Sequence, residues 1–268
     1  MPHIFSHKGT KIYSHHSVDS YPDANVFNMH AHDWLEILYC ISGKGNYIVE
    51  DSIYSLEPGD IFIIRPGEMH KLQIDSSSAY ERIVIRFSPD LFDDYSAKDA
   101  LLKIFYDRRK GQHNRHRIDD LNIVKTAFSN YEFKNIYNIE LNLLGRLILI
   151  LTALEGIYTS SEESVSSNIQ SKLLSYVDEH LFDNISVGDI AEAFGKSRSQ
   201  INRIFSRMTG KSLWDYVITK RLMAARTMIQ SGESAHEACN DCGFSDYSAF
   251  YRAYKARFGN SPRDDAPK

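Results

Sequence analysis

Three histidines and a glutamate are the residues of the first third of the chain whose types and spacing suit chemistry. His30, His32 and Glu36 fall at even spacings, and His70 closes the segment that begins at Gly59. Side chains alternate between the two faces of a strand, so the first three can share one face and His70 can join them from a neighbouring strand. Three imidazoles and a carboxylate suit Fe, Mn, Ni or Zn. Alternatively, these residues are hydrogen-bonded within a barrel or contact a small-molecule effector.

A repeated pattern in the C-terminal part suits contact with DNA. Ser186–Gly210 and Ser234–Gly259 each contain a short helical segment, a turn with glycine, and a second helical segment whose outer side is polar and basic. This pattern is typical of a helix-turn-helix, whose second helix can enter the major groove. Arg and Asn can read base edges, while Ser, Tyr and Lys more often hold phosphates. The residues predicted to contact DNA are Arg198, Ser199, Asn202, Arg203, Arg207, Tyr247, Ser248, Tyr251, Arg252 and Lys255.

The solvated face of an ordinary helical bundle is the alternative for either polar stripe, but two copies with matching turns favour DNA binding. Helix starts are marked by serines followed three residues later by Asp, Gln or Glu, which can form capping boxes. These serines are Ser186, Ser197, Ser212 and Ser234. Glycines that tolerate the left-handed geometry of helix ends stand at 195, 210, 232 and 243.

The elements that must position these residues divide the chain into four parts. Residues 1–88 are predicted to form an antiparallel β-sandwich or barrel, from short runs such as 35–41, 46–50, 61–64 and 82–87. Residues 89–158 are predicted to be helical, over 91–108, 118–132 and 139–158. Residues 159–168 are small and polar and predict a linker, and residues 169–268 are predicted to be all-helical. The expected fold class is therefore α+β with two domains.

Composition excludes several other classes. The N-terminus shows no secretory signal, and the most apolar stretch, 141–157, is too short and too polar to span a bilayer. Three cysteines do not make a disulfide framework, so we expect a cytoplasmic protein without a membrane partner. The formal charge of −4 conceals a mildly basic C-terminal part, where residues 168–268 hold 14 Lys/Arg against 12 Asp/Glu. That balance alone is weak support for nucleic-acid binding.

The C-terminal part, over about residues 169–264, resembles the DNA-binding domain of the AraC/XylS transcription regulators. The resemblance is carried by Ile185-Ser186, Ile190-Ala191, Arg203-Ile204-Phe205, Thr209-Gly210-Lys211-Ser212, Arg221, Cys242-Gly243-Phe244-Ser245-Asp246 and Gly259-Asn-Ser-Pro262. It implies seven helices, with residues 213–230 as a rigid connector between the two DNA readers. It also implies that the outward residues named above face bases and phosphates.

The second unit departs from this family pattern in four places. Ala235 and Ala238 replace aliphatic residues, Tyr254 stands where Phe is usual, and the tail at 263–265 lacks a customary tyrosine-arginine. These departures predict a looser second unit that contributes less to affinity. Cys239 and Cys242 form a C-x-x-C spacing, for which core packing is favoured over a redox pair or metal site.

The histidine segments resemble the two motifs of the cupin fold, which some AraC-type regulators carry as a sensor domain. The first motif matches the family spacing, whereas the second, from Gly59 to His70, has one extra residue and lacks the usual final asparagine. The resemblance implies either a divalent metal or a ligand pocket at these positions, and regulation requires no cofactor. The predicted effector pocket comprises His30, His32, Trp34, Glu36, Tyr39, Tyr47 and His70. The aromatic rings suit stacking against a sugar, and they suit a barrel core equally well.

The sequence therefore predicts a DNA-binding transcription regulator, not an enzyme, that responds to a small-molecule effector. The apolar surface of 139–158 is wide enough for two packing partners, and the family uses this region to dimerise, so we expect a homodimer. Promoter DNA is the expected partner, with RNA polymerase as a further partner if the protein activates. A metal-dependent cupin enzyme tethered to DNA and a ligand-independent DNA-binding dimer are the alternatives. The sequence leaves open whether residues 1–25 form a regulatory arm.

Overall fold

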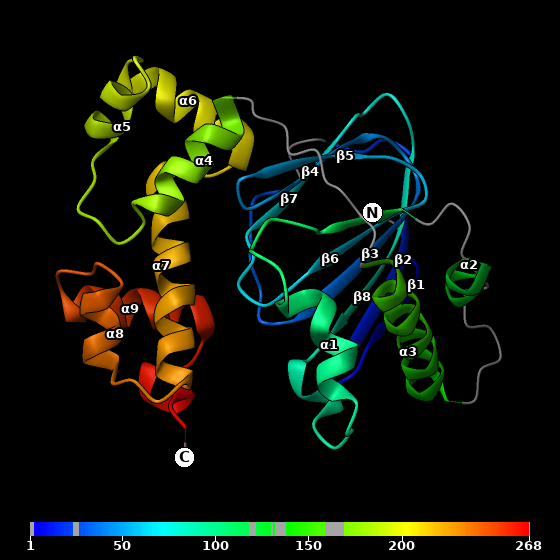
Figure 1. Ribbon diagram of the computed structural model, residues 1–268. Helices are drawn as coiled ribbons and strands as arrows, with labels where there is room; N and C mark the ends of the chain where they lie inside the picture. Colours follow the sequence, from blue (N-terminus) through cyan, green and yellow to red (C-terminus); the bar gives the residue numbers. More distant parts are fainter. Residues whose placement is uncertain are drawn as a thin grey trace. The chain divides into compact units, whose positions relative to one another are not determined.

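The chain divides into two units, residues 1–166 and 167–268 (Figure 1). The computed structural model describes residues 3–23, 27–117, 122–129, 131, 138–158 and 169–267. The predicted linker, 159–168, lies outside these residues. Within them, no helix is both long enough and apolar enough to cross a membrane.

Two antiparallel sheets build the first unit. The larger has six strands in the order β1 (His3–Lys8), β2 (Ile12–Asp19), β8 (Tyr80–Phe87), β3 (Leu35–Ser42), β6 (Asp60–Ile64) and β9 (Arg115–Arg117). The smaller has the order β5 (Ser52–Leu56), β4 (Gly45–Val49) and β7 (His70–Ile74). The four predicted strand runs are confirmed as β3, β4, β6 and β8.

Alternation along the strands separates two apolar cores. Ile37 and Ile85 point to the face of the large sheet that the helices cover, together with the buried side chains of those helices. Leu38 and Val84 point to the other face, where they pack with Tyr47 and the rest of the small sheet. The large sheet is therefore buried on both sides, which explains why β6 is apolar at nearly every position.

Three helices follow the sheets, and α1 and α3 lie against one face of the large sheet (Figure 1). The prediction over 139–158 is confirmed as α3 (Ile139–Tyr158). Of the helix predicted over 118–132, the described residues contain α2 (Asn122–Phe128). The single helix predicted over 91–108 is wrong: a 3₁₀ turn, η1 (Pro89–Phe92), precedes α1 (Lys98–Tyr106). The intervening polar segment, Asp93-Asp94-Tyr95-Ser96, favours local turns over helix.

Two segments to which the sequence assigned no strand belong to the large sheet. Residues 89–158 were expected to be helical, yet Arg115–Arg117 pair with β6 as the edge strand β9. Residues 3–8 and 12–19, for which the sequence left a regulatory arm open, form β1 and β2. Ser14, His15, His16 and Ser17 in β2 are all buried, so this strand lacks the apolar pattern that would have revealed it.

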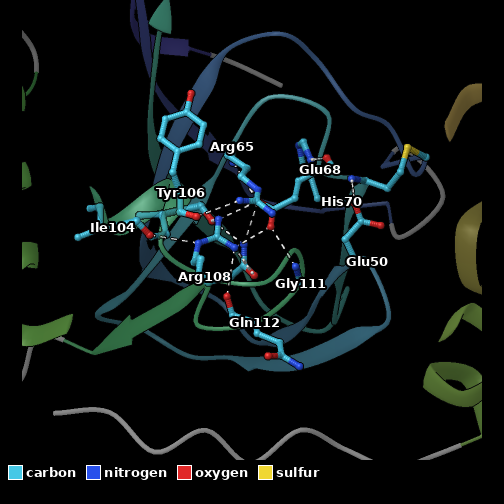
Figure 2. Close-up of polar contacts among 12 residues, drawn as sticks. Glu50, Arg65, Glu68, His70, Ile104, Tyr106, Arg108, Gly111 and Gln112 are labelled. Carbon is cyan, nitrogen blue, oxygen red and sulfur yellow. Dashed lines mark hydrogen bonds and ion pairs between the residues drawn. The ribbon is translucent and has the colours of Figure 1, made fainter. Parts of the chain in front are cut away.

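A buried ion pair ties the turn after α1 to the loop before β7 (Figure 2). Both side chains of Arg108 and Glu68 are fully buried, and Arg108 donates two hydrogen bonds to Glu68, at 2.6 and 2.8 Å. The guanidinium also donates to the carbonyls of Ile104 and Gln112. Glu68 accepts a further bond from the Gly111 amide at 3.0 Å. Arg108 is therefore buried, although the basic residues that follow it, Arg109 and Lys110, are exposed.

The same network fixes the residue that follows it, His70. The Glu68 carbonyl accepts a hydrogen bond from Nδ1 of His70 at 2.9 Å. Glu50 holds Met69 from the other side, since its amide donates to the Met69 carbonyl and its carboxylate accepts from the Met69 amide. The position of the His70 ring thus depends on buried polar contacts from the turns that follow α1 and β4.

The second unit contains six α-helices among its described residues, and a 3₁₀ helix takes the place of the seventh expected. They are α4 (Ile169–Glu179), α5 (Val187–Ala193), α6 (Arg198–Thr209), α7 (Leu213–Gln230), α8 (Ala235–Asp241), α9 (Tyr247–Phe258) and η2 (Pro262–Asp265). Figure 1 shows α7 as the connector between the α4–α6 group and the α8–α9 group. Both helix-turn-helix pairs, α5–α6 and α8–α9, form as predicted.

The predicted helix caps are confirmed. Complete capping boxes form at Ser186, Ser197 and Ser234, and the Ser212 hydroxyl accepts from the Asp215 amide at 3.1 Å. Gly243 has a φ of +75°, and a Cβ added there would lie 2.7 Å from the Phe182 carbonyl oxygen. This turn therefore requires glycine.

Arg221 of α7 joins the two halves of the second unit. Its guanidinium donates to the carbonyls of Leu181 and Asp183 on one side and of Gly243 on the other, at 2.6 to 2.8 Å. These bonds connect the loop before α5 to the turn between α8 and α9. A single side chain of the connector thus sets the relation between the two helix-turn-helix pairs.

Two of the four departures in the second pair, Tyr254 and the acidic tail, contact each other. The Tyr254 hydroxyl donates to Asp265 at 2.8 Å, and Arg226 lies 3.0 Å from the same carboxylate. Cys239 and Cys242 are buried in the core of this pair, as core packing predicted. The tyrosine and the acidic tail thus form one contact, which argues against a loose second unit. Its contribution to DNA affinity stays a prediction.

Replacing Arg108 by methionine should destabilise the first unit by about 3–5 kcal/mol, because the Glu68 carboxylate is left buried without its cation. The measurement is urea unfolding followed by Trp34 fluorescence in protein that also carries Trp214→Phe. Arg109 is exposed, so Arg109→Met is the matched control, and it should change stability by no more than about 0.5 kcal/mol. Equal unfolding midpoints for the two variants would contradict the structural role of Arg108.

Candidate functional site

The three histidines lie together at one end of the barrel. One ring nitrogen from each of His30, His32 and His70 lies within 4.8 Å of the others. His30 and His70 exchange both backbone hydrogen bonds, at 3.0 and 2.8 Å, which brings their rings to a centroid distance of 4.3 Å. The sequence predicted a strand at His30 and His32, and this prediction is wrong. His30 makes only an isolated bridge with His70, and β3 begins at Leu35.

Backbone carbonyls orient the rings of this cluster. Nδ1 of His30 donates to the Asn28 carbonyl, and Nδ1 of His70 donates to that of Glu68, both at 2.9 Å. The hydrogen on Nδ1 leaves a lone pair on Nε2 in the neutral ring. Nε2 of His70 is buried and has no hydrogen-bond partner among the described residues. Burial lowers the pKa of His70 well below its usual value and also lowers that of His30, so both rings are neutral near pH 7.

Glu36 lies beside the histidines, but its carboxylate is already engaged. Arg86 donates to it at 2.5 Å, His32 lies at 3.0 Å, and the Tyr47 hydroxyl donates at 3.3 Å. Burial alone would raise the pKa of the Glu36 carboxyl, but Arg86 and the hydrogen bond with His32 hold it well below its usual range. The set of four predicted ligands thus divides into three imidazoles and one carboxylate paired with arginine.

These residues line an inner cavity of about 90 Å³. His30, Glu36, Tyr47 and His70 are on its wall, as predicted. Sequence reasoning missed other members of the wall, namely His15, Phe27, Leu38, Leu72, Arg82, Val84 and Arg86. Most come from β2 and β8, where the polar residues carried no motif.

Two predicted pocket aromatics lie elsewhere. Trp34 lines a second cavity together with His32. Tyr39 is wrong as a pocket residue, because it points to the helix-covered face of the large sheet and stacks on Phe128 at a centroid distance of 4.5 Å. Alternation along β3 explains this, since Glu36 and Tyr39 are an odd number of residues apart.

The outer face of α6 presents the residues predicted to contact DNA. Arg198, Ser199, Asn202, Arg203 and Arg207 are all exposed. The opposite side is buried through Ile201, Phe205 and Met208. The helix therefore has one side in the core and one polar, basic side available to a partner.

The outer face of α9 is built in the same way. Ser248, Tyr251, Arg252 and Lys255 are exposed, whereas Phe250 and Tyr254 are buried. Tyr247 is only half-buried and stacks on His236 of α8 at a centroid distance of 4.0 Å. The structure thus holds Tyr247 at the start of the exposed face through a contact that sequence reasoning missed.

The chain matches two families of domains and several regulators. Residues 18–118 match the AraC-like ligand binding domain, and residues 190–266 match a helix-turn-helix domain. The HTH-type transcriptional activator RhaS of Escherichia coli is 26% identical over 265 residues, which cover 93% of this chain and 95% of RhaS.

Among solved structures, ToxT from Vibrio cholerae O395, bound to (E)-4-(8-methylnaphthalen-1-yl)but-3-enoic acid, aligns over 95% of this chain and 98% of its own, with 15% identity and a TM-score of 0.42. The DNA-binding domain of AdpA in complex with a target DNA aligns over 35% of this chain and 86% of its own, with 25% identity and a TM-score of 0.34. The two domain matches and the relatives along nearly the whole chain show that this protein belongs to the AraC family of transcription regulators, with a ligand-binding domain followed by a helix-turn-helix DNA-binding domain.

Proposed function

We propose that this regulator inserts α6 and α9 into successive major grooves on one face of promoter DNA. The observation that carries the proposal is the matching exposure of basic and polar residues on both helices, each opposite a buried apolar side. The connector α7 has 18 residues and is therefore about 27 Å long. That length is compatible with readers one DNA turn apart, about 34 Å.

We further propose that a small molecule bound in the first unit controls DNA binding. A ligand can shift a conformational equilibrium only by its difference in affinity for the two states. The cavities beside the histidines provide polar and aromatic groups for such a ligand, and a sugar suits them. Relatives are named transcriptional activators, which supports activation and, with it, RNA polymerase as a partner. The relatives come from a bacterium, which supports the cytoplasm as the place where this regulator meets its DNA.

Regulation without catalysis is the function we propose, and the state of Glu36 supports it. A metal cupin enzyme would use the carboxylate of the four-residue set, Glu36, as a metal ligand. Here the carboxylate is bound by Arg86, His32 and Tyr47.

A divalent metal is a second candidate occupant of the inner cavity, favoured by the unpartnered Nε2 of His70. Three imidazoles whose Nδ1 atoms face backbone carbonyls suit Zn, Ni or Fe(II). His30, His32 and His70 would hold the ion, which would serve to fix the histidine loop. DNA binding does not require it.

A second copy of the chain is the partner that we propose for α3. Leu143, Leu147 and Ile150 are fully buried against the sheet, whereas Leu141 and Leu149 on another side are 66% and 44% exposed. Gly145 lies between these two at one-turn spacing and has open space where a side chain would stand. This exposed apolar row could admit a neighbouring helix closely.

Replacing Arg203 or Arg252 by alanine should each weaken binding to a promoter fragment by about 1–3 kcal/mol, because a base-reading arginine is lost. Gel shifts at one fixed salt concentration provide the measurement. Arg263→Ala is the matched control, since Arg263 is exposed but lies in η2, outside both recognition helices. If neither substitution shifts the binding curve relative to that control, the assignment of reading residues is wrong.

Leu149→Arg should convert the dimer to a monomer at micromolar concentration, because it places a charge in the apolar row of α3. Light scattering of the full chain measures this. Tyr106→Arg changes a side chain of similar exposure, 46% against 44%, on α1 and should stay dimeric. A wild-type protein that is monomeric at this concentration, free or DNA-bound, would refute the proposed dimer.

Chelation should remove any bound ion, which elemental analysis of the protein measures. It should leave DNA binding in gel shifts unchanged. If a metal fixes the histidine loop, His70→Ala should lower its stoichiometry to near zero, while His113→Ala, which alters a histidine outside the cluster, should not. A metal-free preparation that keeps its full effector response would rule out a role for the ion in regulation.

A further inference from the structure

A second cavity, of about 520 Å³, opens beside the histidine cluster. Its wall is formed by Lys8, Gly9, Tyr13, His32, Trp34 and Arg86. This volume lies within the range of small-molecule sites, roughly 300–1,000 Å³. We call it the outer cavity, and it shares Arg86 with the inner one.

The register of four adjacent strands places its polar groups in one row. Lys8 of β1 pairs with Tyr13 of β2, Tyr13 pairs with Arg86 of β8, and Arg86 pairs with Glu36 of β3. Directly paired residues project to the same face of a sheet. Neighbouring strands are about 4.8 Å apart, so the backbones of Lys8 and Arg86 stand about 10 Å apart, with the tyrosine between them.

The charges along this row favour an anion. Arg86 uses Nε to bind Glu36, and that carboxylate offsets the charge of the arginine. The two terminal nitrogens of Arg86 and the ammonium of Lys8 have no hydrogen-bond or ion-pair partner among the described residues. Five N–H donors in a fixed fork allow an arginine to bind two carboxylates at once. Lys8 therefore adds an ammonium group to a wall that still offers donors, although the Glu140 carboxylate lies beside Gly9 of the same wall.

The outer cavity also offers flat apolar surface. Tyr13 and Trp34 are both half-buried, so each ring keeps a part of its surface accessible. Aromatic rings pack well against the faces of sugar and aromatic rings. The wall thus combines two cations with two aromatic rings.

We propose that the outer cavity binds a small organic acid, a carboxylate carried on a six-membered ring. Lys8 and Arg86 hold the carboxylate, while Tyr13 and Trp34 pack against the ring. This inference rests on the proposed control by a small molecule and names the chemical class of that molecule. The carboxylate would share Arg86 with Glu36, which links the ligand to the histidine cluster next to it.

The test uses the fluorescence of Trp34 in the full chain. The protein contains two tryptophans, so Trp214→Phe leaves Trp34 as the sole reporter. Sodium glucuronate and sodium benzoate are titrated at constant ionic strength, each against an uncharged counterpart, glucose and benzyl alcohol. At least one acid should change the fluorescence in a saturable way. Its concentration at half-saturation should be roughly tenfold lower than that of its neutral counterpart. The two acids distinguish a sugar ring from an aromatic ring.

Lys8→Met should raise the dissociation constant of the binding acid by roughly tenfold, since one charged partner is lost. Lys8 is exposed, so its loss should not disturb the fold. Arg86→Met is not used, because it would leave the buried Glu36 carboxylate without its cation. Lys11→Met is the matched control, because Lys11 lies on the same hairpin but faces Asp90 at 3.3 Å. It should leave binding unchanged.

Three results would overturn the inference: no saturable response to either acid, equal affinity for an acid and its neutral counterpart, or unchanged affinity in Lys8→Met. Saturable binding of glucose alone would support an effector-binding cavity, and it would contradict only the proposal that the ligand is an acid. Gel shifts with the same protein test DNA binding separately, so a failure of the proposed function is recognised independently.

Discussion

The ion pair between Glu36 and Arg86 is the interaction on which the ligand-binding unit depends. A carboxylate buried beside three imidazoles is stable only with a cation in contact, because unpaired buried charge costs several kcal/mol. The register of β3 against β8 places Arg86 directly opposite Glu36. The Glu36 carboxylate of this pair also accepts a hydrogen bond from Tyr47 and lies against His32, and both cavities have Arg86 on their wall.

A second buried pair supports the first from the far side of His70. Arg108 binds Glu68, whose carbonyl orients the His70 ring. The histidine cluster is therefore held between two ion pairs whose partners lie 40 and 50 residues apart in sequence. The DNA-binding unit depends more on contacts between residues close together in the sequence. Its helix starts are fixed by local caps, and Arg221 bonds to both of its halves.

This difference explains how much the sequence could predict. The capping boxes at Ser186 and Ser234 each involve residues no more than three positions apart, so they can be recognised in the sequence. Gly243 marks a turn that only glycine fits, and the second unit could therefore be predicted closely. Tyr39 was wrongly predicted to line the pocket, although the alternation of side chains along β3 places it on the opposite face from Glu36. Arg108 could not have been predicted to be buried, because its partner is far away in the sequence and its neighbours are basic and exposed. The strand β2 escaped detection because its buried residues are polar.

The central claim is that two helices of one DNA-binding unit read two adjacent grooves. Hydroxyl-radical footprinting of the full chain on DNA selected from a random pool tests it most directly. The account predicts protected tracts in register with two major grooves, about 10 base pairs apart on one face of the duplex, for each bound unit. Arg203→Ala should open one of these tracts and Arg252→Ala the other. A single protected groove per unit, or loss of the same tract in both variants, would contradict the account.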